Sequence, residues 1–182
     1  MRKTICLSFF ITQSIILFGQ TTEKFNSLAS NLIPIDTIQI ADNYKNGGTK
    51  ETGTILKFEF EGDIYELHSG KLLRYYRNEQ VCSEIEYNSF GCELSSKYYD
   101  LNGILISESK TTKIDINGDQ VKGFLEIKKN RLVYNYNKSY LYSMKSNDLY
   151  LKSEGNTLNG KKIGKWIKYS RSGSITKVSN YK

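Results

Sequence analysis

The side chains that could carry acid–base chemistry are few. The chain has a single histidine, His68, so a zinc site with several histidines is excluded. Any Ser–His–Asp triad or Cys–His pair would have to use His68. If Gly62-Asp63 forms a two-residue hairpin turn, the resulting register pairs Phe58 with Leu67 and places His68 opposite Lys57. A lysine is a poor neighbour for a general base or a metal ligand, so we expect a structural role for His68.

Two glutamates would lie together in the same hairpin. The Gly62-Asp63 turn places Glu59 directly opposite Glu66, with their Cβ atoms roughly 5 Å apart. Such a pair could raise the pKa of one carboxyl for the acid–base work of a hydrolase. A solvated face with nearby lysines is the alternative, and we favour it. We therefore expect no catalytic residues and no enzymatic activity.

Four oxygen-bearing residues have the spacing of a calcium-binding loop. They are Asp115, Asn117, Asp119 and Glu126, at positions 1, 3, 5 and 12 of the loop pattern. Position 6 should be glycine but is Gln120, and the flanking residues are typical of strands rather than helices. The sequence therefore predicts no metal site and no cofactor.

Lysines and aromatic residues alternate near the end of the sequence. The lysines are Lys161, Lys162, Lys165 and Lys168, and the aromatic residues are Trp166 and Tyr169. Such a surface could contact anionic lipid, glycan or nucleic acid, but lysines more often protect a sheet edge from pairing. The net charge of +7 is spread along the chain. It favours weak attraction to anionic surfaces, not a specific nucleic-acid site.

Internal repetition is the strongest structural signal. Three stretches contain the same sequence motif: an Asn-Gly turn, a Gly before an apolar residue, an aromatic or aliphatic residue three positions on, and a second turn. They cover residues 159–173, 46–62 and 117–131, and the first, with Gly164 and Trp166, is the cleanest. Each copy predicts one hairpin, which cannot bury its apolar face without its neighbours.

Composition also favours sheets. The chain has 14 Tyr, 8 Phe and one Pro, and tyrosine suits strands with one solvated face while proline interrupts strands. Tyr76, Tyr99 and Tyr169 each end a strand before a turn. We expect an all-β fold in which residues 46–182 form a single domain, an elongated antiparallel β-meander of repeated hairpins.

The segment before these hairpins, residues 20–45, shows no repeat. Phe25, Leu28 and Leu32 have helical spacing before Pro34, and the isoleucines that follow indicate a short strand.

Residues 1–19 have the pattern of a secretory signal peptide. Arg2 and Lys3 precede a mostly apolar run from Thr4 to Phe18, and small Gly19 follows. An uncleaved membrane anchor is the alternative, but the run is shorter than the roughly 20 residues that a spanning helix needs. The prediction is an extracytoplasmic protein: periplasmic, on the cell surface or secreted.

Two cysteines, Cys82 and Cys92, lie beyond the expected signal peptide. An even number in an exported protein suggests a disulfide. The local register argues against one: a four-residue turn over 88–91 would place Tyr87 opposite Cys92 and Cys82 opposite Lys97. Five positions along a strand correspond to about 16 Å, which exceeds the reach of a disulfide.

Residues 159–169, with Gly173, closely resemble the MORN-repeat variant of the YwqK-like family. Residues 70–76 and 98–108 look like weaker copies, so the resemblance is strong over about 159–182 and moderate over about 46–110. It implies an elongated antiparallel β-meander without a catalytic motif. It also implies a binding or scaffold role, with a protein or cell-envelope component as the partner. An antitoxin-like protein that neutralises a toxin is the alternative.

Overall fold

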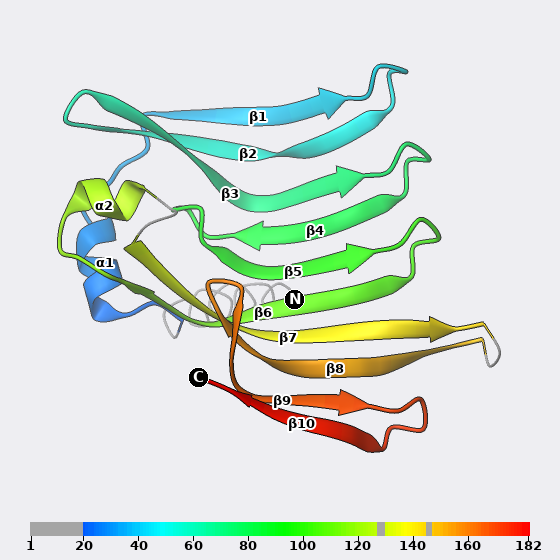
Figure 1. The fold of residues 1–182 in the computed structure, drawn as a ribbon. Helices are drawn as coiled ribbons and strands as arrows, with labels where there is room; N and C mark the ends of the chain where they lie inside the picture. Colours follow the sequence, from blue (N-terminus) through cyan, green and yellow to red (C-terminus); the bar gives the residue numbers. More distant parts are fainter. Residues whose placement is uncertain (1–19, 127–129, 145–146) are drawn as a thin grey trace, which may run out of the picture.

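The computed structural model describes residues 20–126, 130–144 and 147–182, which contain one ten-stranded antiparallel sheet. In chain order the elements are α1 (Glu23–Ala29), β1 (Asp36–Asn43), β2 (Thr49–Phe60), β3 (Asp63–Tyr75), β4 (Val81–Tyr87), β5 (Glu93–Tyr99), β6 (Leu105–Ile116), α2 (Val121–Leu125), β7 (Arg131–Ser143), β8 (Asp148–Leu158), β9 (Lys161–Tyr169) and β10 (Ile175–Tyr181). Each strand pairs with the next one along the chain, and the sheet does not close (Figure 1). The predicted all-β antiparallel meander is confirmed.

Five turns share one hydrogen-bonded geometry. The first residue donates its N–H to the carbonyl four positions on, and the fourth residue donates back to the first carbonyl. These turns span residues 44–48, 76–80, 88–92, 100–104 and 170–174. The fourth residue has a positive φ; it is glycine in four turns and Glu79, with φ 66°, in the fifth. Glycine meets that requirement without strain, so the turns expected at Gly103 and Gly173 are confirmed.

The β2–β3 hairpin has a different register from the expected one. Its two-residue turn is Glu61-Gly62, with φ of 54° and 82°, which is the left-handed pair that a type I′ turn needs. Phe58 therefore pairs with Tyr65 rather than with Leu67. The expectation that Gly62 opens the turn was wrong because Glu61 itself adopts the left-handed conformation. A slip of two residues leaves every side chain on its expected face.

The three copies of the sequence repeat are not structurally equivalent. The Asn46-Gly47 turn joins β1 to β2, and the Asn159-Gly160 turn joins β8 to β9 at the opposite end of the strands (Figure 1). Phe124, which the third copy placed in a hairpin, lies in α2 and is fully buried. The prediction of a third hairpin over 117–131 was wrong because this segment fills the core instead of extending the sheet.

The apolar core lies at one end of the sheet, where both helices pack (Figure 1). Its buried members are Phe25, Ala29, Phe58, Leu67, Cys92, Ile114, Ile116, Phe124 and Leu125. The rings of Phe25, Phe90 and Phe124 form a three-membered cluster, with the centroids of Phe25 and Phe90 4.8 and 5.4 Å from that of Phe124 and 6.2 Å from each other. The Thr22 hydroxyl caps α1 by accepting the N–H of Phe25. The helical spacing before Pro34 and the strand after it are therefore confirmed as α1 and β1.

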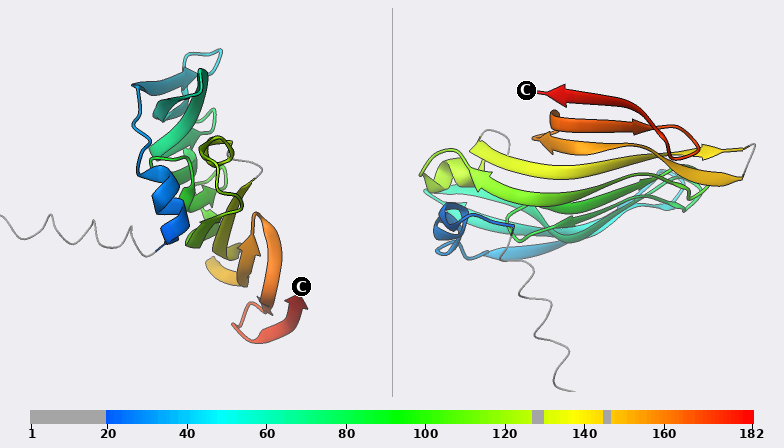
Figure 2. Two further views of the ribbon diagram at one scale, coloured as in Figure 1. Left: turned by 90° about the vertical axis from the view of Figure 1, so that its left-hand side faces the viewer. Right: turned by 90° about the horizontal axis from the view of Figure 1, so that it is seen from below.

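The other end of the fold has no such core. Among the described residues after Leu125, none is a buried apolar side chain. Strands β8–β10 curve away from the plane of the earlier strands as a single layer (Figure 2). Within the described residues, the helices pack against one end of the strands, and β7–β10 carry no buried apolar side chain. The start of β7 still contacts α2, because the buried Arg131 guanidinium donates to the Phe124 carbonyl.

Two sequence expectations concern residues 1–19, which lie outside the described part of the chain: the signal peptide and its membrane-anchor alternative. In the described part, no helix is both long enough and apolar enough to span a bilayer.

Candidate functional site

Small polar side chains fill one face of the central sheet. Cross-strand partners lie on the same face, so the register defines rows that run across the strands. One row contains Ser96, Ser109, Asn137, Gly155 and Trp166. The row beside it contains Tyr98, Ser107, Ser139, Ser153 and Lys168. We call the surface formed by these two rows, together with Asn135 and Thr157, the serine face.

The serine face has a hollow of about 270 Å³ between two aromatic side chains, Tyr98 and Trp166. The indole lies flat on the sheet, because a Cβ added to Gly155 would approach indole Cδ2 to 2.5 Å. Trp166 also donates its Nε1–H to the Asn156 carbonyl at 2.8 Å. The missing side chain of Gly155 therefore leaves room for the Trp166 ring to pack against the sheet, where it forms one wall of the hollow.

Hydroxyl and amide groups form the floor of the hollow. Asn137 Nδ2 donates to Thr157 Oγ1 at 2.9 Å, and the hydroxyls of Ser139 and Ser153 lie 2.9 Å apart. The Ser109 hydroxyl is buried without a hydrogen-bond partner. This floor offers both donors and acceptors, which suits a polar backbone or a hydroxylated ligand.

The opposite face carries a row of alternating charge. The row contains Glu84, Lys97, Glu108, Lys138 and Glu154. Tyr140 donates its hydroxyl to Glu108 at 2.6 Å, and Tyr169 donates to Glu154 at 2.5 Å. These hydrogen bonds hold the pKa of both carboxyls below the usual range. The charges compensate one another within the sheet, so this charged face has less need of a partner than the serine face.

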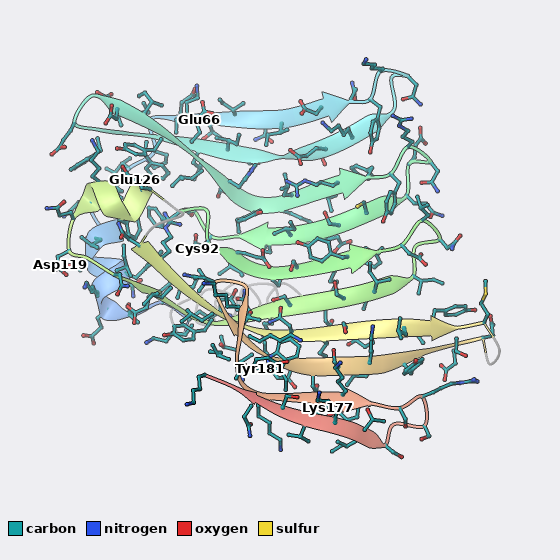
Figure 3. All side chains as sticks on the ribbon, viewed as in Figure 1. Glu66, Cys92, Asp119, Glu126, Lys177 and Tyr181 are labelled. Atoms are coloured by element: carbon teal, nitrogen blue, oxygen red, sulfur yellow. The ribbon has the colours of Figure 1, made fainter. Side chains whose placement is uncertain are left out.

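The structure does not form the glutamate pair that sequence reasoning weighed for a hydrolase. Glu59 pairs with Ile64, and Glu66 pairs with Lys57. The Lys57 ammonium lies 3.3 Å from the Glu66 carboxylate, at the upper part of the sheet in Figure 3. The Glu59/Glu66 hypothesis was wrong because the turn lies one residue earlier than expected.

His68 is also displaced by the new register. It lies opposite Ile55 rather than Lys57, and its ring stacks on Tyr87 with a centroid distance of 5.3 Å. This is a packing contact on β3, away from the hollow.

The calcium-loop residues are spread over β6, the following turn and the end of α2. Asp115 pairs with Lys113 at 2.8 Å, and Asp119 pairs with Lys24 at 2.7 Å. Asp119 and Glu126 lie at opposite ends of the α2 segment (Figure 3). Within the described residues, no three His, Cys, Asp or Glu side chains gather as potential metal ligands.

The four lysines of the last repeat do not guard a sheet edge. All four lie in β9, which is an internal strand because β10 pairs with its outer side. Lys162 Nζ lies 4.2 Å from the Trp166 ring centroid and 5.5 Å from that of Tyr181. The edge-protection hypothesis for these lysines was wrong, since the pattern did not reveal one more strand beyond β9.

Both described cysteines are free, as we expected, although the register behind the expectation was wrong. Tyr87 pairs with Glu93, and Lys97 pairs with Glu84. Cys92 is buried and accepts a hydrogen bond from the Arg131 guanidinium at 2.9 Å. Burial raises the pKa of its thiol, against the opposing effect of the guanidinium.

Sequence reasoning missed the serine face. The signal was present as Ser, Thr or Asn at every second position in 107–111 and 135–139, and as Ser153, Gly155 and Thr157 in the third segment. The register that aligns these segments was unknown. Comparison with models of known protein families and with curated proteins finds no match to the chain. The likeness to the MORN-repeat variant thus stays a prediction from residue pattern.

Proposed function

We propose that the protein is a non-enzymatic binding or scaffold module whose serine face receives a protein or cell-envelope partner. The observation that carries the proposal is the bare single-layer sheet over β7–β10. A sheet normally buries one face against a second layer, and here no apolar side chain is buried among the described residues after Leu125. A partner on the serine face would supply that layer.

The chemistry of the hollow supports a polar partner rather than an apolar one. Its floor is made of hydroxyls and amides, while Tyr98 and Trp166 supply flat aromatic area at the rim. Tyrosine and tryptophan combined with serine, glycine and asparagine are typical of antibody binding surfaces. The charged face differs, because its tyrosine hydroxyls already donate to the carboxylates of Glu108 and Glu154.

The MORN-like resemblance and the export signal are part of the same proposal. The cleanest motif, residues 159–173, covers the β8–β9 turn, β9 and the β9–β10 turn, so it lies in the bare region. Export through residues 1–19 would place the module outside the cytoplasm, where an envelope component is available. A toxin as the captured partner would instead support the antitoxin-like alternative.

Two adjacent positions on β7 test which face binds. Ser139 belongs to the serine face, and Lys138 lies in the row of the charged face. A photo-cross-linking residue at Ser139 should capture one discrete partner in intact cells, and the same residue at Lys138 should not. Equal capture from both positions, or capture from Lys138 alone, would contradict the proposal.

A further inference from the structure

Among the described residues no further strand pairs with the outer side of β1 or β10, and these two edge strands run in opposite directions. β1 and β10 end the strand order, and their arrows point in opposite senses in Figure 1. Because the number of strands is even, a second copy placed beyond β10 would present its β1 antiparallel to β10. The meander would then continue from one copy into the next without a change of pattern.

One row of cross-strand partners crosses the whole sheet and changes charge from one edge to the other. In order it contains Asp42, Glu51, Arg74, Ser83, Tyr98, Ser107, Ser139, Ser153, Lys168 and Lys177. The row starts with two carboxylates at the β1 edge and ends with two ammonium groups at the β10 edge. Lys177 lies on the outermost strand (Figure 3).

Both ends of this row are electrostatically unfavourable in one isolated copy. Asp42 lies directly opposite Glu51, and Lys168 lies directly opposite Lys177. Like charges at directly opposed positions of a sheet repel. Arg74 offsets the charge of Glu51, but Asp42 and Lys177 are exposed at the two free edges.

The same row fixes a register for edge pairing. With Asp42 of one copy opposite Lys177 of the next, Ile40 lies opposite Ser179 and Ile38 opposite Tyr181. On the other face, Ala41 meets Val178 and Gln39 meets Asn180. This ladder of five pairs contains one pair of opposite charges, one pair of amides, two apolar pairs and the mixed Ile40–Ser179 pair, with no like charges opposed.

We propose that the β1 edge of one copy pairs with the β10 edge of another, so that the protein assembles head to tail into a continuous antiparallel sheet. The interface is heterologous, and the association stays open because each added copy exposes the same two edges. The sheet already twists from β1 to β10 (Figure 2), so the assembly is a twisted ribbon. This inference does not depend on the proposed function of the serine face.

Lys177 has another interpretation, because a lysine in an edge strand commonly prevents pairing. A two-fold β10–β10 dimer is a second alternative. It would bring the two Lys177 side chains to diagonal positions about 7–8 Å apart, and it would leave Asp42 uninvolved. The charges of β1 therefore distinguish head-to-tail pairing from both alternatives.

Sedimentation velocity of the purified full chain over a concentration series tests the proposal. The wild type should form larger species as its concentration rises, and the effect should weaken from about 50 mM to about 500 mM salt because screening acts on exposed pairs. A monomer at every concentration and salt would overturn the proposal and support a guarding role for Lys177.

Charge reversal makes the test specific. Lys177→Glu and Asp42→Lys should each raise the concentration for half-assembly by about tenfold or more, since each turns an attraction into a repulsion. An equimolar mixture of the two variants should assemble again, because each supplies the edge that the other needs. Failure of the mixture to assemble, or wild-type assembly by Asp42→Lys alone, would overturn head-to-tail pairing.

Lys165→Glu is the matched control. It makes the same change in net charge at an exposed position of the internal strand β9, and it should leave assembly unchanged. A loss as large as that of Lys177→Glu would mean that net charge, not the edge contact, controls association. Far-ultraviolet circular dichroism of each variant should match the wild type, because all three positions are exposed.

Discussion

The two ends of this molecule use the same strand pairing for different purposes. At the helix-covered end, Phe25 and Phe124 are almost completely buried, with exposed fractions of 2% and 0%. Over β7–β10 the described strands are paired just as regularly, but their apolar side chains are half-buried or, like Leu141 and Val178, exposed. Backbone hydrogen bonds thus organise the whole sheet, whereas apolar burial is concentrated at one end.

This difference means that the residues that stabilise the fold and the residues that are free to bind a partner lie in different parts of the sheet. Burial of apolar area is the main favourable contribution to folding, so the helix-covered end should contribute most of the free energy of unfolding. The bare strands are held by ladder hydrogen bonds, by the Gly155–Trp166 contact and by tyrosine–glutamate hydrogen bonds. They keep both faces and one edge free, as a binding or assembling module requires.

Truncation of a core aromatic should give the largest effect. Phe124→Ala should lower the free energy of unfolding by about 3–5 kcal/mol, because it removes a fully buried ring that two other rings contact. Leu141→Ala on β7 should cost about 0.5 kcal/mol or less, since Leu141 is exposed. Denaturant melts measure both, and similar costs at the two sites would break the comparison between the two ends.

Gly155→Ala should give the next largest effect, within the bare region itself. The new methyl group would lie 2.5–2.7 Å from indole atoms near the root of the Trp166 side chain. We expect a loss of about 1–3 kcal/mol from overpacking, with a change in the fluorescence of this single tryptophan. Gly48→Ala is the control, since its nearest neighbours are at 3.7 and 4.0 Å. An equal loss of unfolding free energy in the two variants would show that the indole is free to move.

Acid should weaken the charged face before the core. Glu108 and Glu154 have pKa values below the ordinary 4.5, chiefly through hydrogen bonds from Tyr140 and Tyr169. A lowered folded-state pKa means that their contribution is present above about pH 4.5 and is lost as the pH falls through the folded value. Glu108→Gln should therefore flatten the acid side of the stability profile. An unchanged profile would mean that these hydrogen bonds add nothing to folding.

The smallest expected effect is a gain at a turn. Glu79 holds a φ of 66° at the position where four equivalent turns have glycine. Glu79→Gly should stabilise the protein by about 0.5–1 kcal/mol by removing left-handed strain, less the extra entropy of the unfolded chain. Gly103→Ala makes the reverse change in the equivalent β5–β6 turn and should destabilise. A loss on Glu79→Gly would show that the glutamate side chain has a role in its turn.

The sequence was informative where local chemistry decides the structure. Turn glycines such as Gly103 predicted hairpins because few other residues accept a positive φ, and alternating side chains predicted strands. The register of the β2–β3 hairpin could not be predicted, since Glu61 took a conformation that glycine usually takes. This turn shifted the β2 partners of residues 63–69 by two positions. The serine face depends on four such registers in succession, and the row from Asp42 to Lys177 depends on nine. Neither could be found before the strands were aligned.

The Asn-Gly repeat also shows where a local pattern misleads. Residues 117–131 carry the same turn signal as the other two copies. Tertiary packing overrides this signal, because Phe124 and Leu125 are buried in the core. The secondary structure of this segment is determined by its tertiary contacts rather than by its own sequence pattern.

Native-state hydrogen exchange, followed strand by strand, tests most directly whether stability is concentrated at the helix-covered end. Amides in β2, β3 and β6 should exchange only through global unfolding, with opening free energies equal to the full stability. Amides in β9 and β10 should open by a smaller, subglobal unfolding, at least about 1–2 kcal/mol below the global value. Equal opening free energies in β3 and β9 would contradict the account, because the bare strands would then share the stability of the core.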